Sequence, residues 1–445
     1  MSQQDKRNVE DEWRRIKTEE EGSLKEKLER LLQRASEKRP PKKHRLDEPR
    51  EEELGWDESQ GDDTPPVSFE GDLFAGGNAA ECPFPADSYH GRIRIGSALE
   101  LKSDILALIS RDDAFQTVDP AKILYLDLET TGLSPGSSNY AFMVGLGYFA
   151  GDEFRVRQHF MRDFSDEIEI LDRLEAFVAQ FNAVVTFNGR AFDLPLIESR
   201  FVLARRRTRL SQLPHLDLLY PSRQIWRERF ESCSLKSLEY NLLGVERHGD
   251  IPGAEIPHVY FEYLRSRNPY WISKIFHHNR LDIVSMMCLL SFCHDLVAGK
   301  HLAHDWQETL GLAFFYERRN NYEQSTLLFS EALETGADRE RRVKAIRRAS
   351  ELHRKAGKRD EAMALWSDGA QEDGFAAIDF LRNMAIQLEH HERRYADALA
   401  LVDDALDRIA NLRDRGIGGA KLLRHQTDFE KRRDRLRKKV PRTGS

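Results

Sequence analysis

Residues 123–133 read ILYLDLETTGL, and this stretch decides the fold of the region around it. Both faces of its first half are apolar, which is typical of a strand buried in the middle of a sheet. Side chains two positions apart on a strand share a face, so Asp127 and Glu129 are expected to project together from the end of this strand. Two carboxylates placed there repel one another unless a cation lies between them. The stretch therefore predicts a central strand that carries a site for a hard cation such as Mg²⁺ or Mn²⁺.

Further strands and helices are predicted after this strand. Residues 140–149 and 154–161 have the pattern of two strands joined by Gly151-Asp152, a turn pair that favours an antiparallel hairpin. Helix, strand, helix and strand follow, over residues 165–181, 183–187, 192–203 and 215–219. This order indicates an α/β fold with a mixed sheet and flanking helices.

Two later segments add acids and imidazoles to the pair on the strand. Residues 186–193 read TFNGRAFD, so that a strand end and a glycine turn lead to Asp193 at the start of a helix, where it either caps the helix or joins the site. Residues 277–282 read HHNRLD within a long predicted helix. His278 and Asp282 are four residues apart and share a helix face, whereas His277 lies five residues before Asp282.

The three motifs, in this order, resemble those of DEDD-type 3′–5′ exonucleases, which have a ribonuclease H-like fold. The detail is most similar to the YprB-like ribonuclease H-like domains, because Cys82, the segment Tyr89-His90-Gly91 and the pair His215-x-Asp217 also match. The resemblance spans about residues 80–297, and it implies a ribonuclease H-like domain over residues 80–300.

This resemblance implies an enzyme that hydrolyses phosphodiester bonds of RNA or single-stranded DNA with two divalent ions, Mg²⁺ or Mn²⁺. A histidine is expected to take the proton of the attacking water. His278 is favoured because it shares a helix face with Asp282, and His277 is the alternative base because other exonucleases of this kind have its spacing. The expected metal ligands, which are also catalytic residues, are Asp127, Glu129, Asp193 and Asp282.

Polar residues near the motifs are candidates for contacts with the substrate. Asn188 either contacts substrate or fixes the backbone near Asp193, and the role of Asp217 is open between a helix cap and a contact behind the metal ligands. Two groups of arginines either follow a phosphate backbone or form a solvated basic face. They are Arg205, Arg206 and Arg207, and Arg223, Arg227 and Arg229.

From residue 302 the pattern changes to helical hairpins that repeat. Residues 321–325, 358–362 and 394–398 occupy equivalent junctions, at offsets of 37 (358 − 321) and 36 (394 − 358) residues. Small residues recur at matching positions, namely Ser325, Ala362 and Ala398, and then Ala332, Gly369 and Ala405. The period resembles that of tetratricopeptide repeats, although an unrelated helical bundle is the alternative. Residues 302–412 are therefore predicted to be an all-α tetratricopeptide-like repeat domain that binds a protein partner.

The two ends of the chain are rich in charge. Residues 1–66 are predicted to be a charged, largely disordered tail, or a segment that folds when it meets a partner. Residues 413–445 are predicted to be a basic tail, because residues 421–445 hold ten Lys or Arg against three acids.

Composition limits the class of protein further. The net charge of the 445 residues is −7 (68 − 75), which argues against a polycation that coats nucleic acid. Since no apolar run reaches the roughly 20 residues that span a bilayer and the first residues are charged, we expect a cytoplasmic protein with no membrane partner. The alternative to a nuclease is a non-catalytic nucleic-acid-binding scaffold whose helical repeats recruit a protein.

Overall fold

A computed structural model describes residues 79–132, 139–268, 272–336 and 338–440. The chain divides into two units, Met1–Pro65 and Pro66–Ser445, and every described residue lies in the second. The tail predicted over residues 1–66 thus lies outside the described residues. No helix in the described ranges is long and apolar enough to cross a membrane.

The first part of the described chain is built on a six-stranded sheet with the order β1-β6-β5-β4-β7-β8. Strands β1, β6, β5 and β4 pair antiparallel, whereas β7 and β8 run parallel to β4. The predicted mixed sheet and the hairpin between β5 and β6 are therefore confirmed. The strands are β1 (Ala79–Pro85), β4 (Ile123–Thr130), β5 (Ala141–Ala150), β6 (Glu153–Phe160), β7 (Ala183–Thr186) and β8 (His215–Asp217), and a separate pair consists of β2 (Tyr89–His90) and β3 (Ile93–Arg94).

Strand β1 is absent from the sequence-based prediction. It contains Pro83 and Pro85, which lack a backbone N–H and argue against a strand in the middle of a sheet. In the structure β1 is an edge strand that pairs with β6 alone, so one side of its backbone needs no ladder partner. The prolines are tolerated for that reason.

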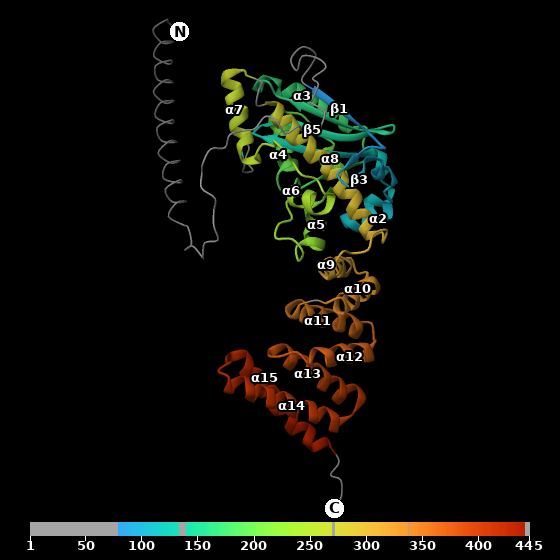
Figure 1. Cartoon of the computed structure of the whole chain (residues 1–445), viewed down its shortest axis with the longest axis vertical. Coiled ribbons are helices and arrows are strands. Elements are labelled where there is room, and N and C mark those ends of the chain that lie inside the picture. The colour runs from blue at the N-terminus through green and yellow to red at the C-terminus, as the bar shows by residue number, and fades with distance from the viewer. Residues whose placement is uncertain (1–78, 133–138, 269–271, 337, 441–445) are drawn as a thin grey trace, which may run out of the picture. The chain divides into compact units, whose positions relative to one another are not determined.

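Helices cover both faces of the sheet (Figure 1). The alternation of β4 divides its apolar residues between two cores, with Ile123 and Tyr125 in the first and Leu124 and Leu126 in the second. The helix α8 (Ile272–Val297) starts in the second core and continues along the first. The first core also receives α2 (Ser103–Ser110), α5 (Leu219–Trp226) and α6 (Leu235–Leu238), and the second receives α3 (Glu167–Val178), α4 (Asp193–Leu203) and α7 (Ile256–Ser266).

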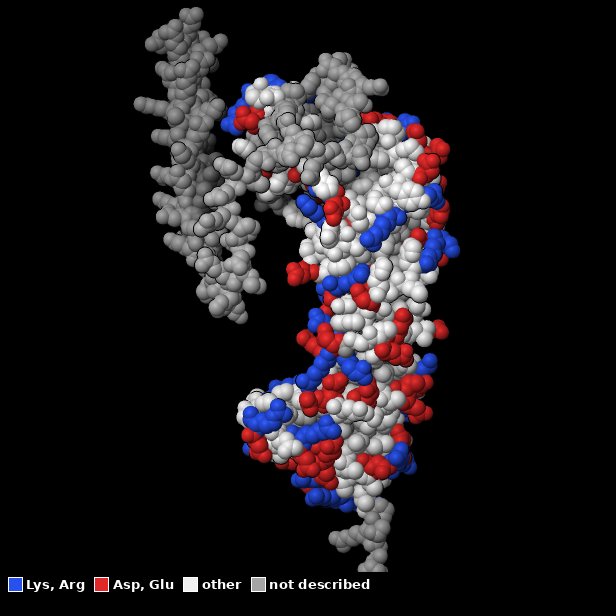
Figure 2. Space-filling model, in the orientation of Figure 1, with Lys and Arg blue, Asp and Glu red and all other residues white. Residues whose placement is uncertain are grey.

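The rest of the described chain is entirely helical, as predicted, and its helices stack one after another (Figure 1). Lys and Arg side chains are interspersed with Asp and Glu over the face of this region that Figure 2 shows, so neither sign of charge dominates there. The helices are α9 (Trp306–Glu317), α10 (Tyr322–Glu334), α11 (Arg339–Lys355), α12 (Arg359–Gly369), α13 (Phe375–Gln387), α14 (Tyr395–Asp414) and α15 (Ala420–Lys439).

The three repeated junctions share one backbone conformation. In each, a residue with positive φ (59°, 76° and 58°) is followed by a helix N-cap with φ between −81° and −86° and ψ between 73° and 75°. The six small residues predicted at the helix contacts are all buried. The junctions therefore repeat in structure as in sequence, and their assignment to tetratricopeptide repeats stays a prediction.

The segment predicted as a basic tail contains α15, which packs against the helices before it. Leu422, Phe429 and Leu436 recur every seven residues, and each is at most 2% exposed. Its basic residues are also partly neutralised, because the buried carboxylate of Glu389 accepts a hydrogen bond from Arg432. The basic tail was predicted from the number of charges alone, without regard to the apolar residues that recur in this segment.

Helix α9 docks directly on α5 of the α/β part. Gly311 lies against the backbone of Ile225, so closely that a Cβ on the glycine would be 1.8 Å from the carbonyl oxygen of Ile225. The indole Nε1 of Trp226 donates a hydrogen bond of 2.6 Å to the buried carboxylate of Glu308. The first core continues from the sheet into α9 and α10. The predicted domain boundary near residue 302 therefore falls between elements that share apolar packing.

Substitution of Gly311 by Ala is expected to lower the free energy of unfolding by about 1–3 kcal/mol, the usual cost of overpacking. The added methyl group would overlap a backbone carbonyl that no side-chain rotation can move. Chemical denaturation of the full chain measures this loss. Gly418→Ala is the control, since its Cβ would meet no atom within 4 Å. Equal stability of the two variants would contradict the close α9–α5 contact.

Candidate active site

The acid pair of β4 lies on the face of the sheet that α8 covers. Ile123 and Tyr125 point into the first core, which α8 lines with Ile283 and its neighbours. Because side chains alternate along a strand, Asp127 and Glu129 continue this row toward the end of β4. The local sequence thus decides which side of the sheet holds the acids.

Two glycines of β5 let α8 approach the sheet at this point. Gly145 pairs with Asp127 of β4, and a Cβ on Gly145 would lie 2.2 Å from the side-chain oxygen of Asn279 on α8. A Cβ on Gly147 would lie 2.4 Å from the side chain of Ile283. Glycine inside a strand often marks such a close approach. These contacts bring the polar residues of α8 to the end of β4.

A chain of buried hydrogen bonds orients the carboxylate of Asp127. Asn279 Nδ2 donates to Asp127 Oδ2 at 2.8 Å, and Asn279 Oδ1 accepts from Gln158 Nε2 at 2.8 Å. Gln158 also donates to the carbonyl oxygen of Phe276 at 2.8 Å. Asn279 is fully buried and Gln158 is 3% exposed, so neither amide rotates freely in solvent. Neither Asn279 nor Gln158 was predicted from the sequence to take part in the site, although Asn279 lies inside the HHNRLD motif.

Asp193 starts α4 beside a turn that Asp217 organises. The carboxylate of Asp217 accepts hydrogen bonds from the backbone N–H groups of Asn188 (2.7 Å), Arg190 (3.0 Å) and Leu219 (3.1 Å). Asn188 has a positive φ of 67°, a conformation that Asn adopts more readily than most residues. Asp217 therefore holds the turn that leads from β7 to Asp193.

The expected metal ligands are close enough to perturb one another electrostatically. Burial, and then the charges of Asp282 and Asp193, raise the pKa of Asp127 well above its usual value. Burial, and then the charge of Asp127, raise the pKa of Glu129 likewise. Burial, followed by the charge of Asp217, raises the pKa of Asp193 to about 7. The charges of Asp193 and Asp282 thus act on both acids of β4, and all four acids are partly buried.

The two neighbouring histidines of α8 have different surroundings. His278 Nδ1 lies 2.8 Å from Asp250 Oδ1, and its Nε2 lies 3.6 Å from Asp282 Oδ2. Burial alone would lower the pKa of His278, but the hydrogen bond to Asp250 and the charge of Asp282 outweigh it and raise this pKa. His277 Nδ1 instead lies 3.1 Å from Arg280. His278 is thus the histidine that the structure brings to the acids.

Arg247 is a further residue of the candidate site that was not predicted from the sequence. Its guanidinium is 2% exposed, and it forms ion pairs with Glu239, Asp250 (3.2 Å) and Asp282. Burial would lower the pKa of Arg247, and these carboxylates raise it beyond its usual value. The segment around residue 247 has no spacing that marks it as part of the site, since it is brought there by the tertiary fold.

The residues predicted to contact substrate occupy different positions relative to Asp193. Arg205, Arg206 and Arg207 follow the C-terminal end of α4, whereas Asp193 occupies its N-terminal end. Arg206 is also paired with Asp172 of α3 at 2.7 Å. Asn188, by contrast, lies in the turn before Asp193. The role of each in substrate binding stays a prediction.

The chemistry of these residues fits a divalent metal, although the ligands are not gathered into a finished site. Carboxylate oxygens are the donors that Mg²⁺ and Mn²⁺ prefer, and a cation would relieve the repulsion that raises the pKa values of Asp127 and Glu129. Within the described ranges, however, no three His, Cys, Asp or Glu side chains already form a group that could hold a metal ion. The ion pair between Arg247 and Asp282 accounts for part of this difference.

Comparison with known proteins agrees with this architecture. Residues 124–292 match the family RNase_H_2, described as RNase_H superfamily, so this part of the chain is similar to domains of that superfamily. Most of the chain is similar to the uncharacterized protein YprB of Bacillus subtilis (strain 168), at 25% identity over 419 residues that cover 88% of this chain and 95% of YprB.

A solved structure is also similar. It is the family B DNA polymerase from the hyperthermophilic archaeon Pyrobaculum calidifontis, at 19% identity and a TM-score of 0.31, and the match covers 44% of this chain and 29% of the polymerase chain. A likeness of this size carries no argument about function.

Replacement of Asp127 by Asn is expected to raise the melting temperature at pH 7.5 in a metal chelator by about 2–4 °C, which corresponds to roughly 1 kcal/mol. The raised pKa of Asp127 means that its ionised form destabilises the folded state, and Asn removes that charge. The gain should shrink as the pH falls and vanish below about 3, where the carboxyl is protonated in both folded and unfolded states. Scanning calorimetry over this pH range measures it.

The control for this measurement is Asp152→Asn, which removes one negative charge from the exposed turn between β5 and β6. It should leave the melting temperature nearly unchanged. A lower melting temperature for Asp127→Asn at pH 7.5 would mean that the buried acids do not repel one another.

Proposed function

We propose that this protein is a metal-dependent nuclease, a 3′–5′ exonuclease that hydrolyses phosphodiester bonds of RNA or single-stranded DNA by a two-metal-ion mechanism. The observation that carries the proposal is the set of partly buried acids at one edge of the sheet, where Asp127 and Glu129 share a face of β4 and where burial, and then neighbouring charges that include Asp193, raise the pKa of both. Burying several like charges is costly unless a ligand compensates them. The match of residues 124–292 to the RNase H superfamily supports the proposal, because the superfamily includes exonucleases and its members typically use divalent metals.

The carboxylates of Asp127, Glu129, Asp193 and Asp282 would hold two divalent ions, which neutralise charge on the attacking and leaving oxygens of a phosphodiester. Asn279 fixes the orientation of the Asp127 carboxylate through its 2.8 Å hydrogen bond. A ligand held in one orientation loses less conformational freedom when it binds.

His278 is the proposed general base. An ionised carboxylate only accepts hydrogen bonds, and the pKa of Asp250 is lowered, because the hydrogen bonds and charges of His278 and Arg247 outweigh its burial. The proton of a neutral His278 therefore resides on Nδ1, toward Asp250, which leaves Nε2 on the side of Asp282 free to accept a proton from water. Asp250 acts as a positioning residue in this arrangement.

The alternative function is a non-catalytic scaffold that binds nucleic acid and recruits a protein through its helical repeats. The ion pair between Arg247 and Asp282 favours this alternative, because a guanidinium already neutralises one expected ligand. The two functions differ in one measurable respect, which is whether the chain releases nucleotides when Mg²⁺ or Mn²⁺ is present.

Incubation with Mg²⁺ or Mn²⁺ is expected to shorten 5′-labelled single-stranded RNA or DNA from its 3′ end, and excess chelator should abolish the reaction. Asp127→Ala and Asp193→Ala should each lower the rate at least about 10²-fold, the loss seen when one group that stabilises a transition state is removed. Asp152→Ala is the matched control, and circular dichroism checks the fold of all variants. Turnover by the wild type in chelator would overturn the metal-dependent mechanism, and the absence of any turnover would favour the scaffold.

His278→Ala is expected to slow hydrolysis by about 10²-fold or more, within the range for a general base, whereas His277→Ala should have a much smaller effect. The reason is that His278 lies between Asp250 and Asp282, while His277 contacts Arg280. Single-turnover rates at saturating metal measure both variants. A larger loss for His277→Ala would transfer the role of base to His277.

A further inference from the structure

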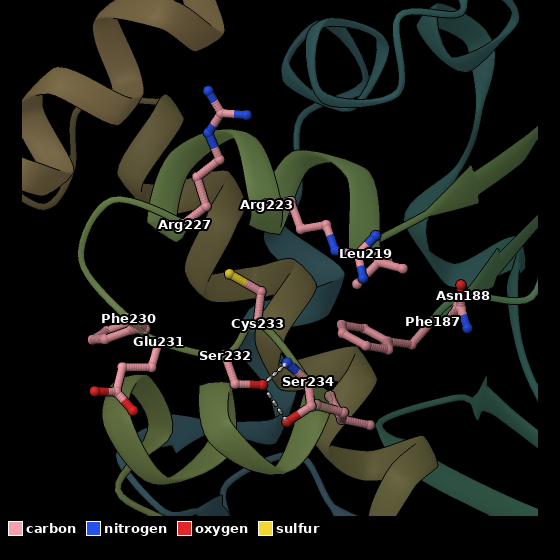
Figure 3. A pocket seen from close by; sticks show the side chains of 11 residues that line it. Phe187, Asn188, Leu219, Arg223, Arg227, Phe230, Glu231, Ser232, Cys233 and Ser234 are labelled. Carbon is pink, nitrogen blue, oxygen red and sulfur yellow. Dashed lines mark hydrogen bonds between the residues drawn. The ribbon is translucent and has the colours of Figure 1, made fainter. Parts of the chain in front are cut away.

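A cavity of about 620 Å³ opens beside the turn that Asp217 organises. Its walls are the end of β7 with Phe187 and Asn188, the helix α5, and the segment between α5 and α6 (Figure 3). Its volume falls within the range of small-ligand sites, about 300–1,000 Å³. Because β4, β7 and β8 run parallel, this wall lies at the same edge of the sheet as the buried acids.

The cavity carries more positive than negative charge. Arg223 lies on α5 and Arg227 is the C-cap residue of this helix, while Glu231 is the acidic residue among the lining residues. Arg223 has no carboxylate within ion-pair distance among the described residues, and Arg227 has only a long contact of 3.8 Å with Glu228. Glu228 is in turn held by Lys344 at 3.0 Å. The two guanidinium groups are therefore available to an anionic ligand.

The basic character continues beyond the cavity toward α9. Burial, and then the charges of Arg227 and Arg111, lower the pKa of Arg318, although the neighbouring Glu317 opposes them. The like charges of these arginines repel one another, and a polyanion bound across them would remove this repulsion.

Aromatic and polar groups complete the lining. The ring of Phe187 points into the cavity, and Phe230 lies at the opposite end (Figure 3). Ser232 and Ser234 also line the cavity, and the hydroxyl of Ser232 donates a hydrogen bond of 3.2 Å to that of Ser234 (Figure 3). Proteins that bind single-stranded nucleic acid without reading its sequence commonly combine aromatic side chains, on which the bases stack, with cationic side chains that contact the phosphates.

The cavity is linked to the buried acids through one turn. Asn188 lines the cavity, while its backbone N–H donates to Asp217, whose charge acts on Asp193. Arg223 extends toward the Asn188 side of the cavity, and Arg227 lies farther from it (Figure 3). An extended ligand that contacts both arginines therefore points toward the acids.

We infer that this cavity binds a single-stranded nucleic acid, with Arg223 and Arg227 on consecutive phosphates and Phe187 against a base, and directs the strand to the acids. The inference rests on the proposed function, since it names the path by which a substrate strand reaches the same site. It concerns binding, which is measurable in chelator without any hydrolysis.

The first test measures the affinity of the full chain for a fluorescein-labelled 12-nucleotide DNA and its RNA counterpart by fluorescence anisotropy in chelator. The double variant Arg223→Gln/Arg227→Gln is expected to bind about tenfold more weakly at 0.1 M salt. Loss of two phosphate contacts should also make the plot of log K against log salt shallower by about 1.4, or about 0.7 per contact for a single strand. Both arginines are exposed, so the fold should survive.

The matched control is Arg354→Gln/Arg359→Gln, which removes the same charge from two exposed arginines at the α11–α12 turn. These two arginines have no ion pair within the described residues. The control should keep the affinity and the salt dependence of the wild type. Equal losses in both double variants would reduce the effect to net charge and overturn the inference.

The second test locates the bound strand through Cys233, a partly exposed thiol in the cavity (Figure 3). Saturating oligonucleotide should slow the alkylation of Cys233 at least about fivefold, since a bound strand would cover it. Cys82, on the edge strand β1, is the internal control and should react at an unchanged rate. Alkylation at pH 8.5, read by peptide mass spectrometry, compensates for the pKa of Cys233, which burial raises.

The outcomes separate this inference from the proposed function. Strand binding that depends on Arg223 and Arg227 and protects Cys233, without hydrolysis in Mg²⁺ or Mn²⁺, would support the inference and contradict the nuclease. Hydrolysis by the wild type, together with unchanged affinity and salt dependence in the double variant and no protection of Cys233, would overturn the inference and leave the nuclease standing. Protection by free nucleoside monophosphate but by no oligonucleotide would also overturn it.

Discussion

The close approach of α8 to β5 is the contact on which the candidate site depends. Gly145 and Gly147 leave no room for a side chain, because a Cβ on either would overlap α8. This approach places Asn279 on the carboxylate of Asp127 and brings His278 and Asp282 to the same edge of the sheet. A helix held farther from β5 would leave the acids of β4 beside an apolar surface, with neither their amide partner nor the third motif.

The balance of charge at this edge is uneven. Arg247 neutralises the acids on its own side, where it pairs with Glu239, Asp250 and Asp282. The carboxylates of Asp127 and Glu129 have raised pKa values, so the field of Arg247 does not offset their burial and mutual repulsion. Folded proteins tolerate such destabilising groups mainly where a ligand or a reaction makes use of them.

The topology of the sheet joins the acids and the basic cavity. The C-terminal ends of parallel strands meet at one edge, and ligands in α/β proteins commonly bind outside that edge. Here β4 carries the acid pair, β7 leads to Asn188, and β8 ends at Asp217. A single carboxylate, that of Asp217, fixes the turn between the buried acids and the arginine-lined cavity. Structural support and the proposed substrate path thus share the same few residues.

The sequence by itself determined the elements whose signals are local. The continuous apolar run of residues 123–126, the turn at Gly151 and the spacing of the helical junctions each act over a few residues, so the sheet, the hairpin and the helical region were predictable. Strand β1 and helix α15 were not predicted, because the prolines of β1 and the charges of α15 obscured their apolar patterns. The charges of Asp193 and Asp282 do act on Asp127 and Glu129 in the structure, and the role of these acids as metal ligands stays a prediction.

Only the tertiary structure decided how these acids are partnered. Arg247, Asp250 and Gln158 reach the site from segments without a recognisable spacing, because a contact between distant segments depends on how the helices and the sheet pack. The different partners of His277 and His278 follow from the rotation of α8 against the sheet, which periodicity alone leaves undetermined. The cavity beside Asn188 likewise arises from segments more than 30 residues apart, and no local pattern encodes such a space.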